Sequence, residues 1–376
     1  MSRALKILAI EPYAALSHQL FLEGLREHSR HDWQLSTLPA RKWKWRMRTA
    51  ALHFVEQVEN GPSASEDWDL LFVSDFLNLQ ELRALLSERA CRIPVVIYFH
   101  ENQLTYPLQA GEELDYHYGL THFYSILSAD SALFNSGYHK DSFLEALERV
   151  LKLVPDIDTR SQLEQARSRC QVMPLGTDVA PRAARRGQIE VPTILWSHRW
   201  EYDKDPRTFV NALYELAARG VPFRVRVLGE RFRVAPPEFA ELQERLPDHL
   251  EQVGFVPDRD AYLEAVAGAD VFVSTARHEF FGLATLEAIR CGLVPLLPRD
   301  LAYPELVATE TGAGDASFLY DRSENLADRL QETLTVVREG GWSQQRNELI
   351  AASQRYHWDQ LGPAYDALFA ELCDAT

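Results

Sequence analysis

The chain has 376 residues, of which 46% are hydrophobic and 25% are charged, a composition typical of a globular protein with room for two complete cores. Its net charge of −16 argues against a protein that binds nucleic acid over its whole surface, so any RNA contact requires a local basic patch. The strongest apolar run, 93–99, is the length of a strand and is too short to span a membrane.

The amino-terminal residues enter a strand pattern at once, so we expect no signal peptide. The four cysteines are scattered without the spacing of a metal site, which is typical of reduced thiols. We therefore expect a cytoplasmic protein without a membrane anchor or a bound metal. Nothing in the pattern specifies an oligomeric state.

The first half of the chain alternates short apolar strands with helices. Strands are predicted at 6–12, 32–39, 69–75, 94–100, 131–136 and 170–176, and helices at 17–28, 46–58, 79–89, 116–128 and 140–152. This alternation predicts a parallel, doubly wound sheet covered by helices on both faces.

The composition then changes to a Pro-, Gly- and Arg-rich stretch, which predicts a linker. A second alternating set follows, with strands at 193–198, 223–229, 250–256, 271–276 and 293–298, helices at 206–220, 259–269, 283–292 and near 324–338, and a last amphipathic helix at 356–372. We therefore expect an α/β protein of two Rossmann-like domains facing a cleft. The predicted boundaries are a first domain at 1–178, a linker at 179–192, a second domain at 193–355 and a terminal helical segment at 356–376.

Ligands of open α/β sheets bind beyond the carboxyl ends of the strands. In the first domain these ends carry Glu11, Asp75 and the run His100–Asn102, and in the second they carry His198–Arg199 and Arg277–Glu279. Neither GxGxxG nor GxxxxGK[ST] follows the first strand, which argues against a dinucleotide dehydrogenase or an NTPase.

The stretch "RHEFFGLATLEAIRCG" places two glutamates around a helix start. The helix amino terminus suits a phosphate, while Glu287 could accept hydrogen bonds from a ribose diol and Glu279 could meet a sugar hydroxyl. Together these features describe a nucleotide sugar. The alternative, that Glu287 is solvated and Glu279 caps the helix, fits the spacing equally well.

The segment "SHRWEYDKDP" offers Arg199 and Lys204 at the end of the second domain's first strand, a pair suited to a diphosphate. The alternative is a solvated loop with internal ion pairs to its own acidic residues. Taken together with the two glutamates, the segment favours the diphosphate site.

A basic, tryptophan-bearing segment lies in the first domain. It contains Arg41, Lys42, Lys44, Arg46 and Arg48, with Trp43 and Trp45 between them. Cations at this density contact RNA phosphates and indoles stack on unpaired bases, although tryptophans are as often packed in a core. The cations predict an RNA contact.

Several blocks together resemble a known family. Arg199, Lys204, Glu279 and Glu287 are similar to the donor-site pattern of retaining GT-B glycosyltransferases of the family-4 type. The segments "TLPARKWKWRMRTAAL", "YFHENQLTYP", "FNSGYHKDSFL", "SHRWEYDKDP", "STARHEFFGLATLEAIRCG" and "LPRDLAYPE" resemble, in order, the tRNA-queuosine mannosyltransferase family. The resemblance implies GDP-mannose as donor, queuosine at the wobble position of tRNA(Asp) as acceptor, and a last helix that crosses back to the first domain.

The resemblance also implies roles for residues. The catalytic set would be His100, Glu279, Arg199 and Lys204, and no metal or other cofactor would be needed. Donor contacts would come from Ser17, His18, Arg199, Lys204, Glu279, Phe281, Gly282, Leu283 and Glu287. Acceptor contacts would come from Arg41, Lys42, Trp43, Lys44, Trp45, Arg46, Arg48, Asn102 and Gln103.

This chain departs from the family at the turn after its first strand, where Ala14, Ala15 and Leu16 replace a glycine pair. A differently shaped turn leaves room for another sugar or acceptor. Two alternatives therefore stay open: a transferase acting on a lipid or polysaccharide, and a binder of nucleotide or tRNA without turnover.

Overall fold

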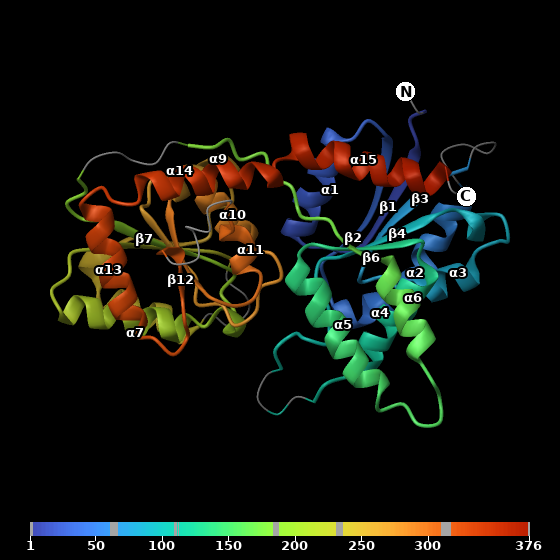
Figure 1. Ribbon diagram of the computed structural model, residues 1–376, viewed down its shortest axis with the longest axis horizontal. Coiled ribbons are helices and arrows are strands. Elements are labelled where there is room, and N and C mark those ends of the chain that lie inside the picture. The colour runs from blue at the N-terminus through green and yellow to red at the C-terminus, as the bar shows by residue number, and fades with distance from the viewer. Residues whose placement is uncertain are drawn as a thin grey trace. The chain divides into compact units, whose positions relative to one another are not determined.

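The computed structural model describes residues 3–60, 67–108, 111, 113–182, 188–230, 236–309 and 317–374. The chain divides into two compact units, which we call unit 1 (Met1–Asp178 with Tyr356–Thr376) and unit 2 (Val179–Arg355). Each unit is a sheet covered by helices (Figure 1). Within the described ranges, none of the helices combines the length and the apolar character needed to cross a bilayer.

Unit 1 is built on a parallel sheet with the strand order β2-β1-β3-β4-β5-β6. The strands are β1 (Lys6–Ala14), β2 (Asp32–Pro39), β3 (Leu70–Ser74), β4 (Val95–Phe99), β5 (Ser131–Phe134) and β6 (Cys170–Val172). The helices that follow them are α1 (Leu16–His28), α2 (Trp43–Asn60), α3 (Leu79–Leu85), α4 (Tyr116–Ser128), α5 (Gly137–Leu151) and α6 (Arg160–Arg169). Every residue of β3, β4 and β5 is buried, because helices cover both faces of the sheet.

Alternate side chains of β3 and β4 form two separate packing layers. Phe72 and Tyr98 pack against Phe21 of α1, and Phe72 also meets Phe369 of α15 (Trp358–Asp374). The neighbouring residues Val73, Ile97 and Phe99 lie in the core cluster formed with α2, α4 and α5. Figure 1 shows α1 and α15 together on one side of the unit 1 sheet.

The last helix, α15, belongs to unit 1 although unit 2 precedes it in the chain. Trp358 is 2% exposed and fills the space beside two glycines: a Cβ on Gly24 would lie 2.3 Å from its Nε1, and one on Gly176 would lie 2.2 Å from its Cδ2. Tyr365 donates its hydroxyl to the carbonyl of Pro174 at 3.0 Å. The terminal helix is therefore anchored by aromatic packing and belongs to the core of unit 1.

Unit 2 repeats the architecture with the strand order β12-β11-β10-β7-β8-β9, again parallel. Its strands are β7 (Thr193–Ser197), β8 (Arg224–Leu228), β9 (Leu250–Gly254), β10 (Val271–Val273), β11 (Val294–Pro298) and β12 (Leu319–Tyr320). Its helices include α7 (Pro206–Ala218), α8 (Pro237–Arg245), α9 (Arg259–Ala267), α10 (Leu283–Arg290), α11 (Tyr303–Val307), α13 (Leu326–Arg338) and α14 (Ser343–Ala352). Two doubly wound parallel sheets confirm the predicted fold class.

The helices that were not predicted include α6, α8 and α14. Each is at most ten residues long and buries only two side chains, such as Leu163 and Ala166 of α6. With so few apolar residues facing a core, the sequence lacks the periodicity that identifies a helix.

The predicted linker, 179–192, lies in part outside the described residues, at 183–187. Its first residues pack on unit 2: the Arg182 backbone N–H donates to the Arg290 carbonyl at 2.7 Å, and Arg290 Nε donates to the Val179 carbonyl. The buried guanidinium of Arg290 thus anchors the start of this stretch to α10.

Candidate donor and acceptor sites

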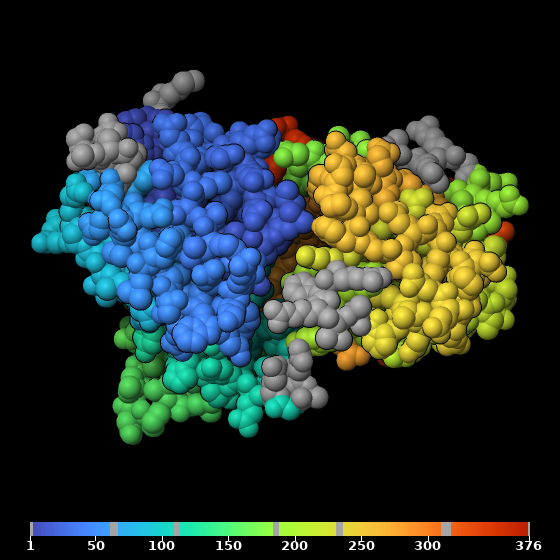
Figure 2. All heavy atoms as spheres, turned by 180° about the vertical axis from the view of Figure 1, so that it is seen from behind, coloured from blue at the N-terminus to red at the C-terminus, as the bar shows by residue number. Residues whose placement is uncertain are grey.

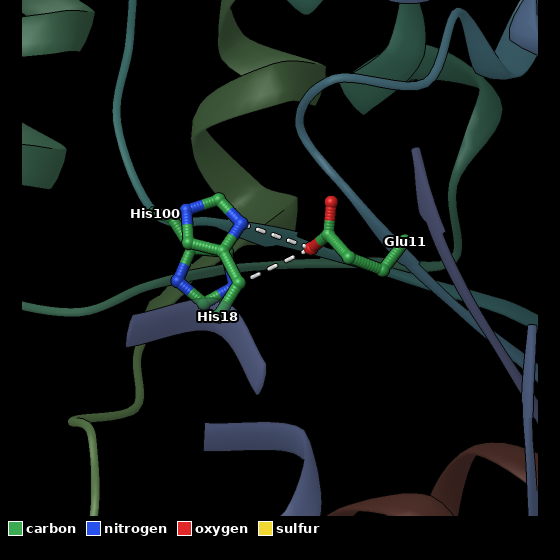
Figure 3. A group of neighbouring side chains, drawn as sticks. All are labelled: Glu11, His18 and His100. Carbon is green, nitrogen blue, oxygen red and sulfur yellow. Dashed lines mark hydrogen bonds and ion pairs between the residues drawn. The ribbon is translucent and has the colours of Figure 1, made fainter. Parts of the chain in front are cut away.

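Three side chains from separate parts of unit 1 meet beyond the carboxyl ends of its strands (Figure 3). Glu11 lies near the end of β1, His18 in the first turn of α1, and His100 directly after β4. His18 Nδ1 is 3.0 Å from Glu11 Oε2, and the two imidazole rings stack with centroids 3.8 Å apart and 15° between their planes. The strand order brings them together, because β1 and β4 both flank β3.

Backbone contacts fix the position of His100. Its N–H donates to Asp75 Oδ1 at 3.1 Å, and its carbonyl accepts from Asn135 Nδ2 at 3.0 Å. Burial, followed by the charges of His18 and His139, holds the pKa of His100 well below its usual value. The imidazole is therefore neutral at pH 7 and is suited to exchange a hydrogen bond with a hydroxyl group.

Glu11, His18 and His100 also have the composition of a metal site, with ligand atoms all within 4.8 Å of one another. An imidazole binds a metal through a ring-nitrogen lone pair that lies in the plane of the ring. The planes of the two stacked rings are nearly parallel and separated, so both lone pairs cannot point at one ion in this arrangement. The geometry favours a proton between Glu11 and His18.

In unit 2, Lys204 is the centre of a buried ion-pair network. Its Nζ donates to the His278 carbonyl at 2.7 Å and lies 3.1 Å from Asp203 Oδ2 and 3.4 Å from Glu279 Oε2. Burial lowers the pKa of Lys204, but the charges of Glu279 and Asp203 outweigh it, so that the pKa is raised overall. The ammonium is therefore charged, and two carboxylates hold it in place.

Arg199 differs from Lys204 in its exposure. Its side chain is 49% exposed, and Nη2 lies 3.3 Å from Glu201 Oε2. The predicted alternative of internal ion pairs is thus partly present in this segment, because Asp203 and Glu201 do pair with its two cations. Lys204 is also held by Glu279, from the stretch that precedes α10, so two distant segments form one site.

The helix α10 begins with its backbone amides uncapped by any side chain. Gly282, the N-cap residue, has φ 93°, which lies in the left-handed region that favours glycine. Phe281 and Gly282 are buried and Leu283 is half-buried. The N-cap position is Gly282 and not Glu279, whose carboxylate lies 3.4 Å from Lys204 Nζ. The free amides and the helix dipole suit an anionic ligand.

Glu287, in the second turn of α10, is 3% exposed, so the alternative of a solvated side chain is also wrong. Its Oε1 forms an ion pair with Arg259 Nη2 of α9. Burial and then the charge of Glu287 raise the pKa of Tyr262, also on α9, whose hydroxyl lies 3.1 Å from Ser197 Oγ. A buried carboxylate oriented by an arginine is suited to accept hydrogen bonds from a diol.

The basic segment 41–48 is largely helical, because the helix predicted at 46–58 begins three residues earlier. Helix α2 begins at Trp43, and only Arg41 and Lys42 precede it. The helix forms because its buried residues recur at helical spacing: Met47, Ala50, Ala51, Phe54 and Val58. Its cations are consequently distributed around the axis of a helix.

The two tryptophans of α2 differ in environment. Trp43 packs against Tyr118 with centroids 4.9 Å apart, whereas Trp45 is 67% exposed. Lys44 and Arg48 are exposed, and Arg48 lies over the Tyr118 ring at 5.4 Å, while half-buried Arg46 donates to the Pro39 carbonyl at 3.2 Å. The face of unit 1 that contains the blue amino-terminal segments is visible in Figure 2. Trp45 is thus the more accessible of the two indoles.

The turn after His100 uses its polar side chains internally. Asn102 is fully buried, and its Oδ1 accepts from the N–H groups of Leu104 and Thr105, both at 3.0 Å. Gln103 Nε2 donates to Glu101 Oε1 at 2.7 Å. Asn102 therefore stabilises the turn after β4, and this structural role accounts for the residue without the predicted contact with the acceptor.

The turn after β1 does not require the glycines that this chain lacks. Ala14 ends β1, Ala15 has φ −70° as the N-cap residue of α1, and residues 14–16 are absent from the described positive-φ positions. Ser17 is exposed beside the buried His18.

The sequence did not reveal the residues that orient the site. Arg259 lies 28 positions before Glu287, and no motif links them. Glu11 was visible as a strand end, but its contact with His18 depends on the direction of α1. Buried His278 contributes a backbone carbonyl to Lys204, which no side-chain pattern can indicate.

Comparison with known proteins agrees with this geometry. A family model described as "tRNA-queuosine alpha-mannosyltransferase N-terminal" matches residues 6–177, and one described as "Glycosyl transferases group 1" matches residues 184–352. The fold is similar to that of sucrose-phosphate synthase from Thermosynechococcus elongatus, with a TM-score of 0.70, 15% identity and coverage of 99% of this chain and 100% of that one. This likeness shows the GT-B fold.

Two curated relatives are informative. The chain is 27% identical over 194 residues to a GDP-mannose:cellobiosyl-diphosphopolyprenol alpha-mannosyltransferase of Xanthomonas campestris, covering 51% of this chain and 50% of that protein. It is 36% identical over 344 residues to the tRNA-queuosine alpha-mannosyltransferase of Drosophila melanogaster, covering 88% of both. The chain is a glycosyltransferase and belongs to the tRNA-queuosine alpha-mannosyltransferase family.

Proposed function

We propose that this glycosyltransferase moves mannose from GDP-mannose to queuosine at the wobble position of tRNA(Asp), with retention at the sugar. The observation that carries the proposal is the 36% identity to the Drosophila enzyme over 88% of both chains. The donor is supported by the Xanthomonas relative, whose name specifies GDP-mannose. A tRNA substrate places the reaction in the cytoplasm.

In this proposal, unit 2 binds the donor. Arg199, Lys204 and the first amides of α10 hold the diphosphate, and the carboxylate of Glu287 receives the ribose diol. Glu279, which already lies 3.4 Å from Lys204, directs its carboxylate at the mannose hydroxyls. These cations take the place of a divalent metal in balancing the diphosphate charge, so we expect EDTA to leave the rate unchanged.

The reaction follows from this arrangement. The bond between the anomeric carbon and the diphosphate oxygen breaks, and its electron pair stays on the diphosphate. The queuosine hydroxyl forms the new bond on the same face and gives its proton to the departing phosphate. Stabilising the charge of that leaving group is the main catalytic task of the cations and helix amides.

Unit 1 binds the acceptor in this proposal. His100, neutral because of its burial, orients a hydroxyl of donor or acceptor. The exposed cations Arg41, Lys42, Lys44 and Arg48 contact phosphates of the anticodon loop, and the exposed ring of Trp45 stacks on an unpaired base. Residues 33–55 contain no acidic side chain, although the chain has 55 of them, which favours an anionic partner at this surface.

The test is a mass shift on the nucleoside. Purified protein is incubated with queuosine-containing tRNA(Asp) and GDP-mannose, and the tRNA is digested and analysed by mass spectrometry. We expect one hexose on queuosine, and none on a matched tRNA that carries guanosine at the wobble position. UDP-glucose and GDP-glucose in place of GDP-mannose identify the nucleotide and sugar that the protein prefers.

Two alternatives are distinguished in the same experiment. If hexose appears only on an added polyprenol-diphosphate acceptor, the protein is a lipid glycosyltransferase like its Xanthomonas relative. If tRNA binds but no donor yields product, the protein is a binder. Either result contradicts the proposal.

A further inference from the structure

The carboxylate of Glu11 is the least exposed member of the unit 1 cluster, at 1% exposure. One oxygen, Oε1, accepts the backbone N–H of Tyr13 at 2.7 Å, and the other, Oε2, lies 3.0 Å from His18 Nδ1 and 4.0 Å from His100 Nε2. Figure 3 shows both rings facing this carboxylate. Both oxygens are thus occupied, one by the backbone near the end of β1 and the other by the stacked pair of histidines.

We propose that Glu11 is a positioning residue of the transfer reaction: it fixes the ring and proton of His18, and through the stacked rings it holds His100 in its working orientation. This inference rests on the proposed function, in which His100 meets substrate. Glu11 itself touches neither donor nor acceptor in this scheme.

One proton lies between Glu11 and His18. A carboxylate accepts hydrogen bonds, so Nδ1 of His18 must carry the proton between them. This hydrogen bond fixes the orientation of the His18 ring and leaves Nε2 as the nitrogen that does not contact Glu11. The rings of His18 and His100 are stacked at 3.8 Å, and two positive charges at this separation repel strongly. The pair therefore does not carry two positive charges, and the hydrogen bond to Glu11 fixes which nitrogen of His18 bears its hydrogen.

Other charged groups surround the cluster from every neighbouring element. Asp75 follows β3, Glu101 follows His100 after β4, and His139 lies on α5; each has an electrostatic effect on the cluster or on Asp75 beside it. Burial raises the pKa of Asp75 well above its usual value, followed by the charges of Glu101 and Glu11. Glu11 is therefore the carboxylate in direct contact with the histidine pair.

Glu11→Gln tests the proposal, because the amide keeps the shape and removes the charge. Protonation of the histidine pair becomes less favourable, so the acidic limb of the pH–rate profile moves to lower pH by about one unit. Misplacement of His100 lowers kcat by about 10²-fold, while KM for GDP-mannose changes less than about threefold. Glu11→Asp keeps the charge but shortens the side chain, so it lowers kcat and leaves the acidic limb in place.

The chain provides a matched control. Asp366 of α15 is a carboxylate buried to a similar degree, which accepts from Ser29 Oγ at 2.6 Å and the Arg30 N–H at 2.9 Å and lies 3.7 Å from His31 Nε2. His31 Nδ1 accepts from the Leu5 N–H, just before β1 begins, whereas Glu11 lies towards the other end of that strand. Asp366→Asn therefore removes a comparable carboxylate–histidine contact, and we expect no change in the acidic limb.

A second measurement does not depend on turnover. In the full-length protein with ¹⁵N-labelled histidine, the NMR spectrum at pH 7.5 is expected to show His18 protonated on Nδ1, with the rings assigned through His18→Gln and His100→Gln. The Glu11→Gln variant is expected to move the titration of the His100 ring to lower pH by about one unit. If His18 carries its proton on Nε2 only, or if the His100 titration does not change, the inference is overturned.

The outcomes separate this inference from the proposed function. A wild-type protein that does not glycosylate queuosine refutes the proposed function, while the NMR result still decides the role of Glu11. Normal transfer by Glu11→Gln with an unmoved acidic limb overturns the inference alone. One equivalent of tightly bound metal in the wild type that is lost in Glu11→Gln also overturns it, because an ion then occupies the place of the proton.

Discussion

Replacement of Lys204 by methionine separates the structural and catalytic roles of the donor site. The ammonium is 7% exposed and lies 3.1 Å from Asp203, whose side chain is completely buried. Methionine has a similar length and no charge, so it fills the space but leaves the Asp203 carboxylate without its counter-ion. The change in stability therefore measures the cost of an unpaired buried charge.

The magnitude follows from this burial. Removal of one partner of a buried ion pair costs about 3–5 kcal/mol, whereas Arg199→Ala, at a half-exposed pair, costs about 0–1 kcal/mol. Both variants lose a cation for the diphosphate, so each should lower kcat/KM by about 10²–10³-fold. The pKa of Lys204 is raised in the folded state, so its stabilisation is present below the unfolded value of about 10.5 and is lost only as pH rises through the folded value.

Urea unfolding at pH 7 and pH 9 and donor kinetics on queuosine tRNA provide the assay. We expect equal destabilisation of Lys204→Met at both pH values. Addition of Asp203→Asn to this variant should restore stability without restoring activity. If Lys204→Met is as stable as the wild type, or if Asp203→Asn restores its activity, the buried network does not hold a phosphate-binding cation.

Four further predictions concern individual side chains. Glu287→Gln should raise KM for the donor about tenfold, from the loss of one charge-assisted hydrogen bond to the ribose, and donor titration by calorimetry checks it. Trp45→Ala should raise KM for tRNA about tenfold without lowering Tm, whereas Trp43→Ala should lower Tm because that ring is packed. Burial raises the pKa of Asp75, so wild-type stability falls as pH rises above about 4 towards the folded value; Asp75→Asn should raise Tm, and the gain should be larger at pH 8 than at pH 5.5. Burial and then the charge of Lys204 lower the pKa of His198 to about 3. The free energy of unfolding therefore loses nothing to this histidine above about pH 6.5 and decreases by about 1.4 kcal/mol per pH unit below it. His198→Gln should reduce that acid sensitivity in urea unfolding.

The order of strands and helices followed from the sequence because it depends on local patterns. Completely buried strands such as β3 and β4 require uninterrupted apolar runs, and long amphipathic helices such as α4 repeat their buried residues at a fixed period. Short helices such as α6 and α14 bury too few side chains to leave that signal. The helix predicted at 46–58 was begun too late because its buried residues start only at Met47, after most of the cations of the basic segment.

The residues of the candidate donor site were also visible in the sequence, since Arg199, Lys204, Glu279 and Glu287 occur near strand ends and helix starts. Only the tertiary structure decided the burial and ion pairing of these side chains. Lys204 is enclosed by carboxylates while Arg199 stays half-exposed, and Glu287 is held by Arg259 from another helix. The stacking of His18 on His100 likewise needs β1, β3 and β4 to be adjacent. Local sequence determines which elements form, because their hydrogen bonds and periodicities are local. Burial, ion pairing and proton position depend on contacts between residues distant in the chain, so only the folded structure decides them.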